Sequence, residues 1–234
     1  MSPRLLLISS SRIHGQAYMA YCKHEVQDFW GSTRKLLFIP YASVDHASYT
    51  DKVRTFLEPF GFEIQGLNEV SDPHQALLAA EGVFTGGGNT FLLVHSLQTR
   101  ELMAPLREKV LAGMPYMGSS AGSNIACPTL KTTNDMPIIQ PPSFETLNLL
   151  PLQINPHYLD PQPDSTHMGE SREDRIREFH QLNTSPVLGL REGALLRREG
   201  TQLSLLGVAG ARLFQAGQAS QEFSPGADLS FLLA

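Results

Sequence analysis

The sequence predicts an α/β fold, with a mostly parallel, doubly wound sheet, helices on both of its faces and a C-terminal antiparallel β meander. Three observations indicate this fold. Short apolar runs alternate with segments of helical apolar spacing through the first half of the chain. Two of the apolar runs, RLLLIS (4–9) and LLFIPYA (36–42), fit strands that are buried on both faces. Near the C-terminus, apolar runs follow one another with only short turns between them, which is typical of antiparallel strands.

Five apolar runs are the expected strands of the first half. They are RLLLIS (4–9), LLFIPYA (36–42), FEIQGL (62–67), GVFTGGGN (82–89) and PYMGS (115–119). Because strand and helix signals alternate, the connections are expected to be right-handed crossovers between parallel strands.

Helical patterns lie between these strands and once more near residue 171. The expected helices cover 19–30, 53–60, 73–81, 90–113 and 171–183. Gly31 and Gly61 follow the first two apolar stripes as stop signals. Ser71-Asp72-Pro73 supplies an N-cap and a first-turn proline for the third helix.

The second half departs from strict alternation. Residues 127–170 are rich in proline and irregular, apart from an expected strand at LQINP (152–156). Another strand is expected at VLGL (187–190), and two further stretches form the predicted meander, with Glu199-Gly200 at a turn. These stretches are ALLRREGTQLSLLGV and ARLFQAG. No repeat or linker interrupts the chain, so a single domain is expected over residues 1–234.

Composition and charge exclude several classes of function. The 234 residues carry a net charge of -5 and no run of Lys and Arg longer than two, so no nucleic-acid partner is expected. No segment reaches the roughly 20 apolar residues of a membrane span. The only two cysteines are Cys22 and Cys127, and the N-terminal stretch lacks a signal-peptide cleavage pattern. Both features predict a cytoplasmic protein without a disulfide framework.

The stretch from Gly118 to Gly122 reads GSSAG and fits the pattern G-x-S-x-G. The pattern selects Ser120 as a nucleophile, because its flanking glycines permit a sharp strand-to-helix turn that exposes one hydroxyl. An ordinary glycine-rich turn is the alternative. A strand before the turn and a helix after it favour the nucleophile, whereas Ser119 is expected to be packed or hydrogen-bonded locally.

The glycine run at 86–88 follows an expected strand and ends at Asn89. Its backbone N–H groups are uncrowded, which suits an oxyanion hole, and we assign the N–H groups of Gly88 and Ala121 to it. Each such donor is worth about 3–4 kcal/mol of transition-state stabilisation. A phosphate cradle is disfavoured, since no Lys-Ser/Thr pair follows. A bare turn remains an alternative.

A nucleophilic serine needs a base and an acid that orients it. His157 is the candidate base, since it ends an expected strand and follows Asn155-Pro156. Glu192 and Asp135 are both candidate orienting acids, and sequence spacing does not separate them. A metal site that includes His157 is the alternative, but its spacing matches no compact metal motif, so no metal is predicted. Its other members would be Asp160, Asp164, His167 and Glu170.

The chain resembles the peptidase E family, the serine-type α-aspartyl dipeptidases. The similar stretches are LFIPYA, GGGNTF, GSSAGSNIACPT, TTNDMPI, LQINPHY, HMGESREDRIREF and GLREG, from about residue 36 to 193. The resemblance implies a fold like that of class I glutamine amidotransferases, with serine where those enzymes carry cysteine. It also implies a cytoplasmic enzyme without a cofactor.

The resemblance assigns roles to individual residues of this chain. Ser120 would be the nucleophile, His157 the base and Glu192 the third member of a Ser–His–Glu triad. Asp135 is the other residue that has been assigned to charge relay, and we favour Glu192, with Asp135 shaping the pocket. Two residues are expected to bind the substrate. They are Arg172, which would grip the aspartate β-carboxylate, and Asn89.

The expected activity is hydrolysis of Asp-X dipeptides through an acyl-enzyme on Ser120. One alternative is a cyanophycinase-like peptidase that cuts β-linked Asp-Arg. Another is a catalytically silent ligand-binding or scaffold member of the fold. An ordinary α/β-hydrolase is disfavoured, because its triad runs Ser, acid, His along the chain. A small peptide is the only expected partner, and the oligomeric state, including a homodimer, is left open.

Overall fold

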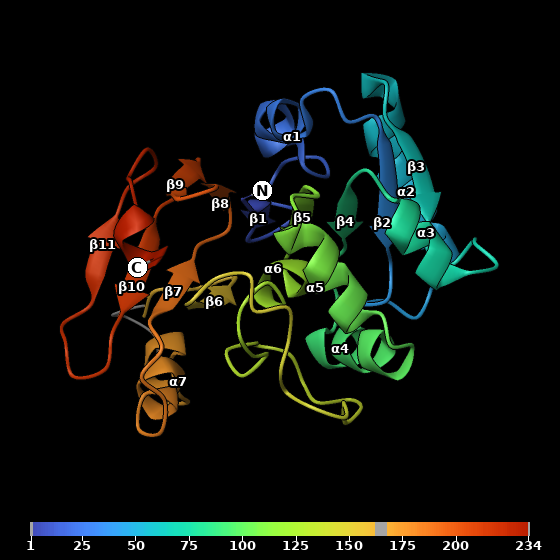
Figure 1. Cartoon of the computed structure of the whole chain (residues 1–234). Helices are drawn as coiled ribbons and strands as arrows, with labels where there is room; N and C mark the ends of the chain where they lie inside the picture. The colour runs from blue at the N-terminus through green and yellow to red at the C-terminus, as the bar shows by residue number, and fades with distance from the viewer. Residues whose placement is uncertain (1, 162–167, 234) are drawn as a thin grey trace.

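Seven strands form the central sheet, in the order β3-β2-β4-β5-β1-β8-β9 (Figure 1). The computed structural model describes residues 2–161 and 168–233. β1 to β5 pair in parallel, whereas β8 pairs with β1 and β9 in antiparallel fashion. The bounds are β1 (Arg4–Ile8), β2 (Lys35–Ile39), β3 (Glu63–Gly66), β4 (Val83–Thr85), β5 (Tyr116–Ser119), β8 (Ala194–Glu199) and β9 (Gln202–Gly207).

Helices cover both faces of this sheet, as expected (Figure 1). The α-helices are α1 (Lys23–Trp30), α2 (His46–Leu57), α3 (Pro73–Ala79), α4 (Thr90–Thr99), α5 (Met103–Leu111), α6 (Ala121–Asn124) and α7 (Arg172–Phe179). Three 3-10 helices are η1 (Ala20–Cys22), η2 (Glu58–Phe60) and η3 (Ser230–Leu233). None of the helices in the described part of the chain has the length and apolar composition needed to span a bilayer.

Local sequence signals mark the end of η2 and the start of α3. Gly61 adopts a left-handed conformation with φ 82° after η2, and Asp72 caps α3 by accepting a hydrogen bond from the N–H of Gln75. The helix predicted over 90–113 is instead two helices, α4 and α5. Glu101 adopts a positive φ of 56° between them, which breaks the helical path although the apolar pattern continues through the buried Leu102.

A second sheet of four strands has the order β11-β10-β7-β6. Its strands are β6 (Gln153–Pro156), β7 (Val187–Leu190), β10 (Ala211–Phe214) and β11 (Gln221–Phe223). The C-terminal strands are antiparallel, as expected, but they are divided between the sheets, since β10 pairs with β7 rather than with β9. The chain leaves the central sheet at Gly207, where φ is 98° and a Cβ would lie 2.1 Å from the carbonyl oxygen of Gly193.

The two sheets meet at the ends of β1 and β7. One apolar core cluster contains β1 residues such as Leu5 together with Ile154 and Leu190 of the second sheet. The buried Ser9 hydroxyl also joins the sheets, because it donates a hydrogen bond of 2.8 Å to the carbonyl of Leu190. This shared core joins the two sheets, and a single domain over residues 1–234 stays a prediction. It also brings the carboxyl ends of β6 and β7 beside those of β1 and β5.

Truncation of Leu190 tests whether both sheets unfold together. Leu190 is fully buried in the shared cluster, so Leu190→Ala is expected to cost about 2–5 kcal/mol of unfolding free energy. Urea denaturation followed by circular dichroism should show one transition at a lower midpoint. Leu182→Ala is the control, because Leu182 is 93% exposed and its loss should change stability by less than about 0.5 kcal/mol. Two separate transitions would contradict a single cooperative unit.

Candidate active site

Ser120 occupies a strained turn between β5 and α6. Its backbone has φ 52° and ψ −109°, a conformation that residues other than glycine rarely adopt. Its N–H donates to the carbonyl of Ile8 at 2.9 Å. Glycine is required on both sides of the turn. A Cβ on Gly118 would lie 2.4 Å from the oxygen of Gly122, and one on Gly122 would lie 2.2 Å from the oxygen of Thr85. These contacts create the sharp elbow that the G-x-S-x-G pattern predicts.

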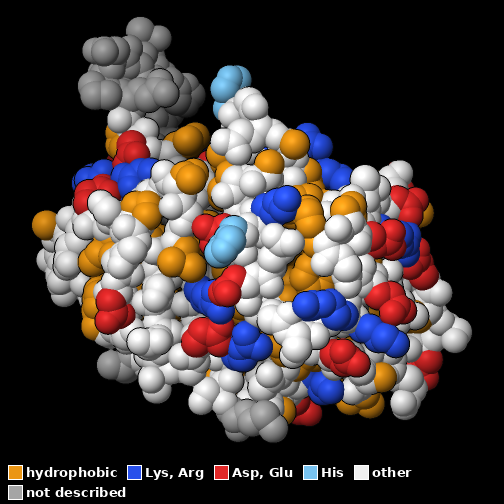
Figure 2. All heavy atoms as spheres, turned by 90° about the horizontal axis from the view of Figure 1, so that it is seen from above, with side chains coloured by type: hydrophobic (Ala, Val, Ile, Leu, Met, Phe, Trp, Pro, Cys, Tyr) orange, Lys and Arg blue, Asp and Glu red, His pale blue; other side chains and the backbone are white. Residues whose placement is uncertain are grey.

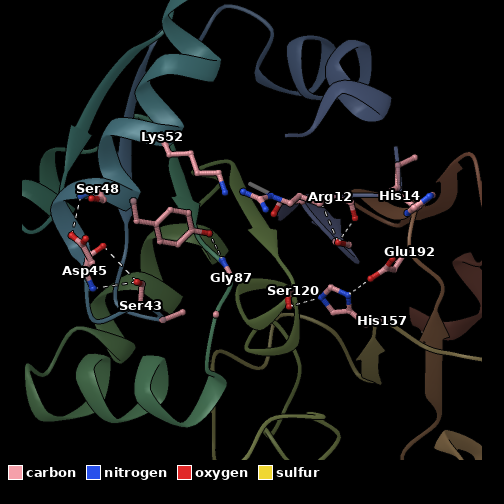
Figure 3. Close-up of a pocket in the computed structure, with 16 residues that line it drawn as sticks. Arg12, His14, Ser43, Asp45, Ser48, Lys52, Gly87, Ser120, His157 and Glu192 are labelled. Carbon is pink, nitrogen blue, oxygen red and sulfur yellow. Dashed lines mark hydrogen bonds and ion pairs between the residues drawn. The ribbon is translucent and has the colours of Figure 1, made fainter. Parts of the chain in front are cut away.

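A chain of hydrogen bonds joins Ser120, His157 and Glu192 (Figure 3). His157 Nε2 lies 2.9 Å from Ser120 Oγ, and His157 Nδ1 lies 2.8 Å from Glu192 Oε1. The three residues follow β5, β6 and β7, respectively. The arrangement has the geometry of a nucleophile, a base and an orienting acid.

The backbone N–H of His157 is held by Ser9. It donates to Ser9 Oγ at 2.9 Å, while the same hydroxyl donates to the carbonyl of Leu190, two residues before Glu192. His157 itself has a positive φ of 54°. The buried serine therefore fixes the backbone of His157 relative to the strand that leads to Glu192. Sequence reasoning missed Ser9, which was only the last residue of the first expected strand (4–9).

Arg191, the residue before Glu192, forms ion pairs with Asp160 and Glu222. Its guanidinium contacts both carboxylate oxygens of Asp160 at 2.7 Å and both oxygens of Glu222 at 3.0 Å. These hydrogen bonds raise the pKa of Arg191 further above its usual value. The bidentate pairs tie the segment after His157 to the residue before Glu192 and to β11.

The glycine run packs against the Ser120 elbow. A Cβ on Gly87 would lie 3.0 Å from Ser120 Cβ, and one on Gly88 would lie 2.2 Å from the oxygen of Ala42. The N–H of Gly87 donates to the Tyr49 hydroxyl at 2.7 Å. Among the described residues, no protein acceptor engages the N–H of Gly88 or of Ala121. Both groups thus have hydrogen-bonding capacity for a ligand, and their oxyanion role stays a prediction.

Asp135 and Asn89 lie in a different hydrogen-bond network. Asp135 Oδ2 accepts from the N–H and the hydroxyl of Thr90, each at 2.7 Å, and from Thr133 Oγ1 at 3.0 Å. Asn89 caps α4 through the N–H of Leu92 and donates from Nδ2 to the carbonyl of Met136. His157 thus forms its hydrogen bond with Glu192 and not with Asp135. Asp135 instead fixes the loop at the start of α4.

A cavity of about 900 Å³ opens at Ser120 (Figure 3). Its lining includes the three hydrogen-bonded residues Ser120, His157 and Glu192, together with Gly87 and Gly88. The loop after β1 and helix α2 contribute further walls. Three residues expected at the substrate are not among the lining residues, namely Asn89, Asp135 and Arg172.

The remaining candidates have structural surroundings. Ser119 is fully buried and packed, and its hydroxyl has no hydrogen-bond partner in the described ranges. Burial raises the pKa of the Cys127 thiol to about 12, so this side chain is not poised as a nucleophile. Of the alternative metal set, Asp160 pairs with Arg191 and Glu170 with Arg175. Asp164 and His167 lie outside the described residues. In the part of the chain that the structure describes, no group of three or more His, Cys, Asp or Glu side chains is placed to hold a metal ion.

The family model "Peptidase family S51" matches residues 5–206. The chain belongs to peptidase family S51. It is 52% identical to a Streptomyces coelicolor protein named "Peptidase E", and the alignment covers 98% of this chain and 94% of that relative. It is 50% identical to a Drosophila melanogaster protein named "Probable alpha-aspartyl dipeptidase", and the alignment covers 98% of this chain and 97% of that relative.

A solved structure has the same fold. The crystal structure of a peptidase from an acI-B1 Actinobacterium superposes with a TM-score of 0.74 at 16% identity, covering 99% of this chain and 98% of that one. The expected α/β fold is thereby confirmed. The S51 match ends within β9, so β10, β11 and the Glu222 contact to Arg191 lie beyond the matched residues.

Substitution of the two candidate acids separates their roles in this S51 peptidase. Glu192→Gln removes the charge beside His157 and is expected to lower kcat by about 10²–10⁴-fold, as for a lost orienting acid. Asp135→Asn weakens a helix cap and is expected to lower the unfolding midpoint with a much smaller change in kcat. Steady-state kinetics and thermal unfolding of both variants provide the comparison. The reverse ranking of the two kcat values would contradict the assignment to Glu192.

Proposed function

We propose that this S51 peptidase hydrolyses dipeptides with an N-terminal aspartate through an acyl-enzyme on Ser120. The observation that carries the proposal is the Ser120–His157–Glu192 chain of hydrogen bonds at the floor of an open cavity. The names of the relatives supply the substrate class, since the chain is about half identical to them over nearly its full length.

The geometry supports a two-step acyl transfer. Ser120 Oγ attacks the carbonyl carbon of the aspartyl residue while His157 Nε2 takes the hydroxyl proton. Glu192 stabilises the imidazolium that forms, and the N–H groups of Gly88 and Ala121 donate to the developing oxyanion. His157 then returns the proton to the leaving amine. In the second step it activates a water molecule, which hydrolyses the ester on Ser120.

Arg172 is proposed to bind the aspartate β-carboxylate. It is the first residue of α7 and is half-buried, and burial followed by the nearby Arg175 charge lowers its pKa. Arg175 and Arg177 of the same helix each pair with a glutamate. Arg172 has no ion-pair partner in the described ranges, so its charge is available for an acidic ligand. Asn89 and Asp135 would then shape this side of the site.

The proposal includes a cytoplasmic location, which the two free, buried cysteines support.

Removal of the nucleophile tests the mechanism. Ser120→Ala is expected to lower kcat for Asp-Leu by about 10⁴-fold or more, because the acyl-enzyme no longer forms. Product release is measured by chromatography, with circular dichroism as the control for folding. The substrates are α-linked Asp-Leu and β-linked Asp-Arg. Full activity of the variant would contradict the mechanism, and a wild-type preference for the β-linked substrate would favour the cyanophycinase-like alternative.

Removal of the proposed β-carboxylate ligand tests the specificity. Arg172→Gln is expected to lower kcat/KM for Asp-Leu about 10- to 100-fold, since a charge-assisted pair to the substrate is lost. Its kcat/KM for Asn-Leu should change little. Arg175→Gln is the matched control on the same helix, because Arg175 already has Glu170 as a partner. An equal loss on both substrates would argue against a carboxylate contact.

A further inference from the structure

Two cationic side chains face the cavity on the side of α2 and the β1 loop. Arg12 and Lys52 both line it, and Figure 3 shows them pointing toward one another near Gly87 and Ser120. Within residues 2–161 and 168–233, neither side chain forms an ion pair with a carboxylate. The cavity therefore contains two positive charges that do not pair directly with any carboxylate of the described residues.

The surrounding structure fixes the Lys52 side chain and the backbone that carries Arg12. Lys52 lies on α2, with its Nζ 4.4 Å from the centre of the Tyr18 ring, a favourable cation–π contact. Arg12 lies in the loop after β1, where the Ser10 hydroxyl accepts a hydrogen bond from the Arg12 N–H at 3.1 Å. Tyr21 in turn donates to the carbonyl of Ser10 at 2.6 Å. Two anchored walls of the cavity thus carry the charges.

The acidic residues of the cavity do not neutralise this pair. Asp45 caps α2 by accepting from the N–H of Ser48, and Glu192 accepts from His157. Partial burial and the charge of Arg12 lower the pKa of Lys52. An anion bound between the two cations would relieve their mutual repulsion, so this part of the cavity favours a negatively charged ligand group.

An Asp-X dipeptide offers two carboxylates, and the position of the cations selects one of them. The β-carboxylate belongs to the aspartyl residue, which forms the acyl part of the substrate. Its proposed ligand is Arg172, which is not among the residues that line this cavity. The α-carboxylate of X lies beyond the scissile bond, within about 4 Å of its nitrogen. We propose that Arg12 and Lys52 bind the α-carboxylate of the leaving residue X, an inference that rests on the proposed function.

This contact would make the enzyme sensitive to peptide length. In a longer peptide the same position holds a neutral amide, whose carbonyl oxygen can accept hydrogen bonds from Arg12 and Lys52 but carries no negative charge to form an ion pair with them. The contact would exist both in the bound substrate and in the transition state. Its loss should therefore raise KM with little change in kcat.

Kinetics with a neutral analogue isolate the contact. The substrates are Asp-Leu and Asp-Leu amide, and the variants are Arg12→Gln and Lys52→Gln. Each variant is expected to raise KM for Asp-Leu about tenfold, while kcat for Asp-Leu and both constants for the amide change less than about twofold. An equal loss on both substrates would overturn the inference, because the cations would then not discriminate the α-carboxylate.

Matched controls account for the loss of a surface charge. Lys23→Gln removes an ammonium that lies 4.5 Å from the centre of the Phe60 ring, an aromatic contact like that of Lys52, but Lys23 does not line the cavity. Arg107→Gln removes an arginine from α5, also away from the cavity lining. Both controls are expected to retain wild-type KM values for both substrates.

A binding measurement separates this inference from the proposed function. Calorimetry on Ser120→Ala should show Asp-Leu binding about tenfold tighter than Asp-Leu amide, with the difference lost in Ser120→Ala/Lys52→Gln. Equal affinity for acid and amide would overturn the inference whether or not the wild type turns over. Failure of the wild type to hydrolyse Asp-Leu, with the carboxylate preference retained, would contradict the proposed function alone.

Discussion

The hydrogen bonds of one buried hydroxyl set the relation between the two sheets at the site. Ser9 Oγ accepts from the backbone of His157 and donates to the carbonyl of Leu190, so the ends of β1, β6 and β7 are fixed together. The N–H of Ser9 also donates to the carbonyl of Ala194 at 3.1 Å, which adds the start of β8. His157 and Glu192, which follow strands of the second sheet, thereby lie within hydrogen-bond reach of one another and of Ser120, which follows a strand of the central sheet.

Steric constraints fix the turns around Ser120 and Gly88 in addition to the hydrogen bonds of Ser9. Close backbone contacts require glycine at positions 88, 118 and 122, and the Tyr49 hydroxyl occupies the N–H of Gly87. Charges of both signs are interspersed over the face seen in Figure 2, without a large patch of one sign. The positive charge at the cavity therefore comes from a few lining side chains, such as Arg12 and Lys52, and not from a large charged patch.

The sequence predicted features that depend on neighbouring residues. The five parallel strands, the Asp72 cap and the elbow at Ser120 each follow from a few adjacent residues. Features that depend on distant segments were missed or misplaced. Nothing local to residues 211–214 shows that β10 pairs with β7, and the Arg191 contacts join residues from three separate segments. The same limit left Glu192 and Asp135 equivalent in the sequence, whereas their hydrogen bonds in the fold differ.

The position of β1 has a consequence for synthesis on the ribosome. β1 emerges before both of its neighbours in the sheet, β5 and β8, which begin at Tyr116 and Ala194. At about 5–20 residues per second, the first partner follows after about 5–20 s and the second after about 10–40 s. The apolar strand must remain unpaired during that interval and is exposed to aggregation or chaperone binding. The proposed Ser120–His157–Glu192 arrangement also cannot form in a nascent chain before Glu192 has been translated.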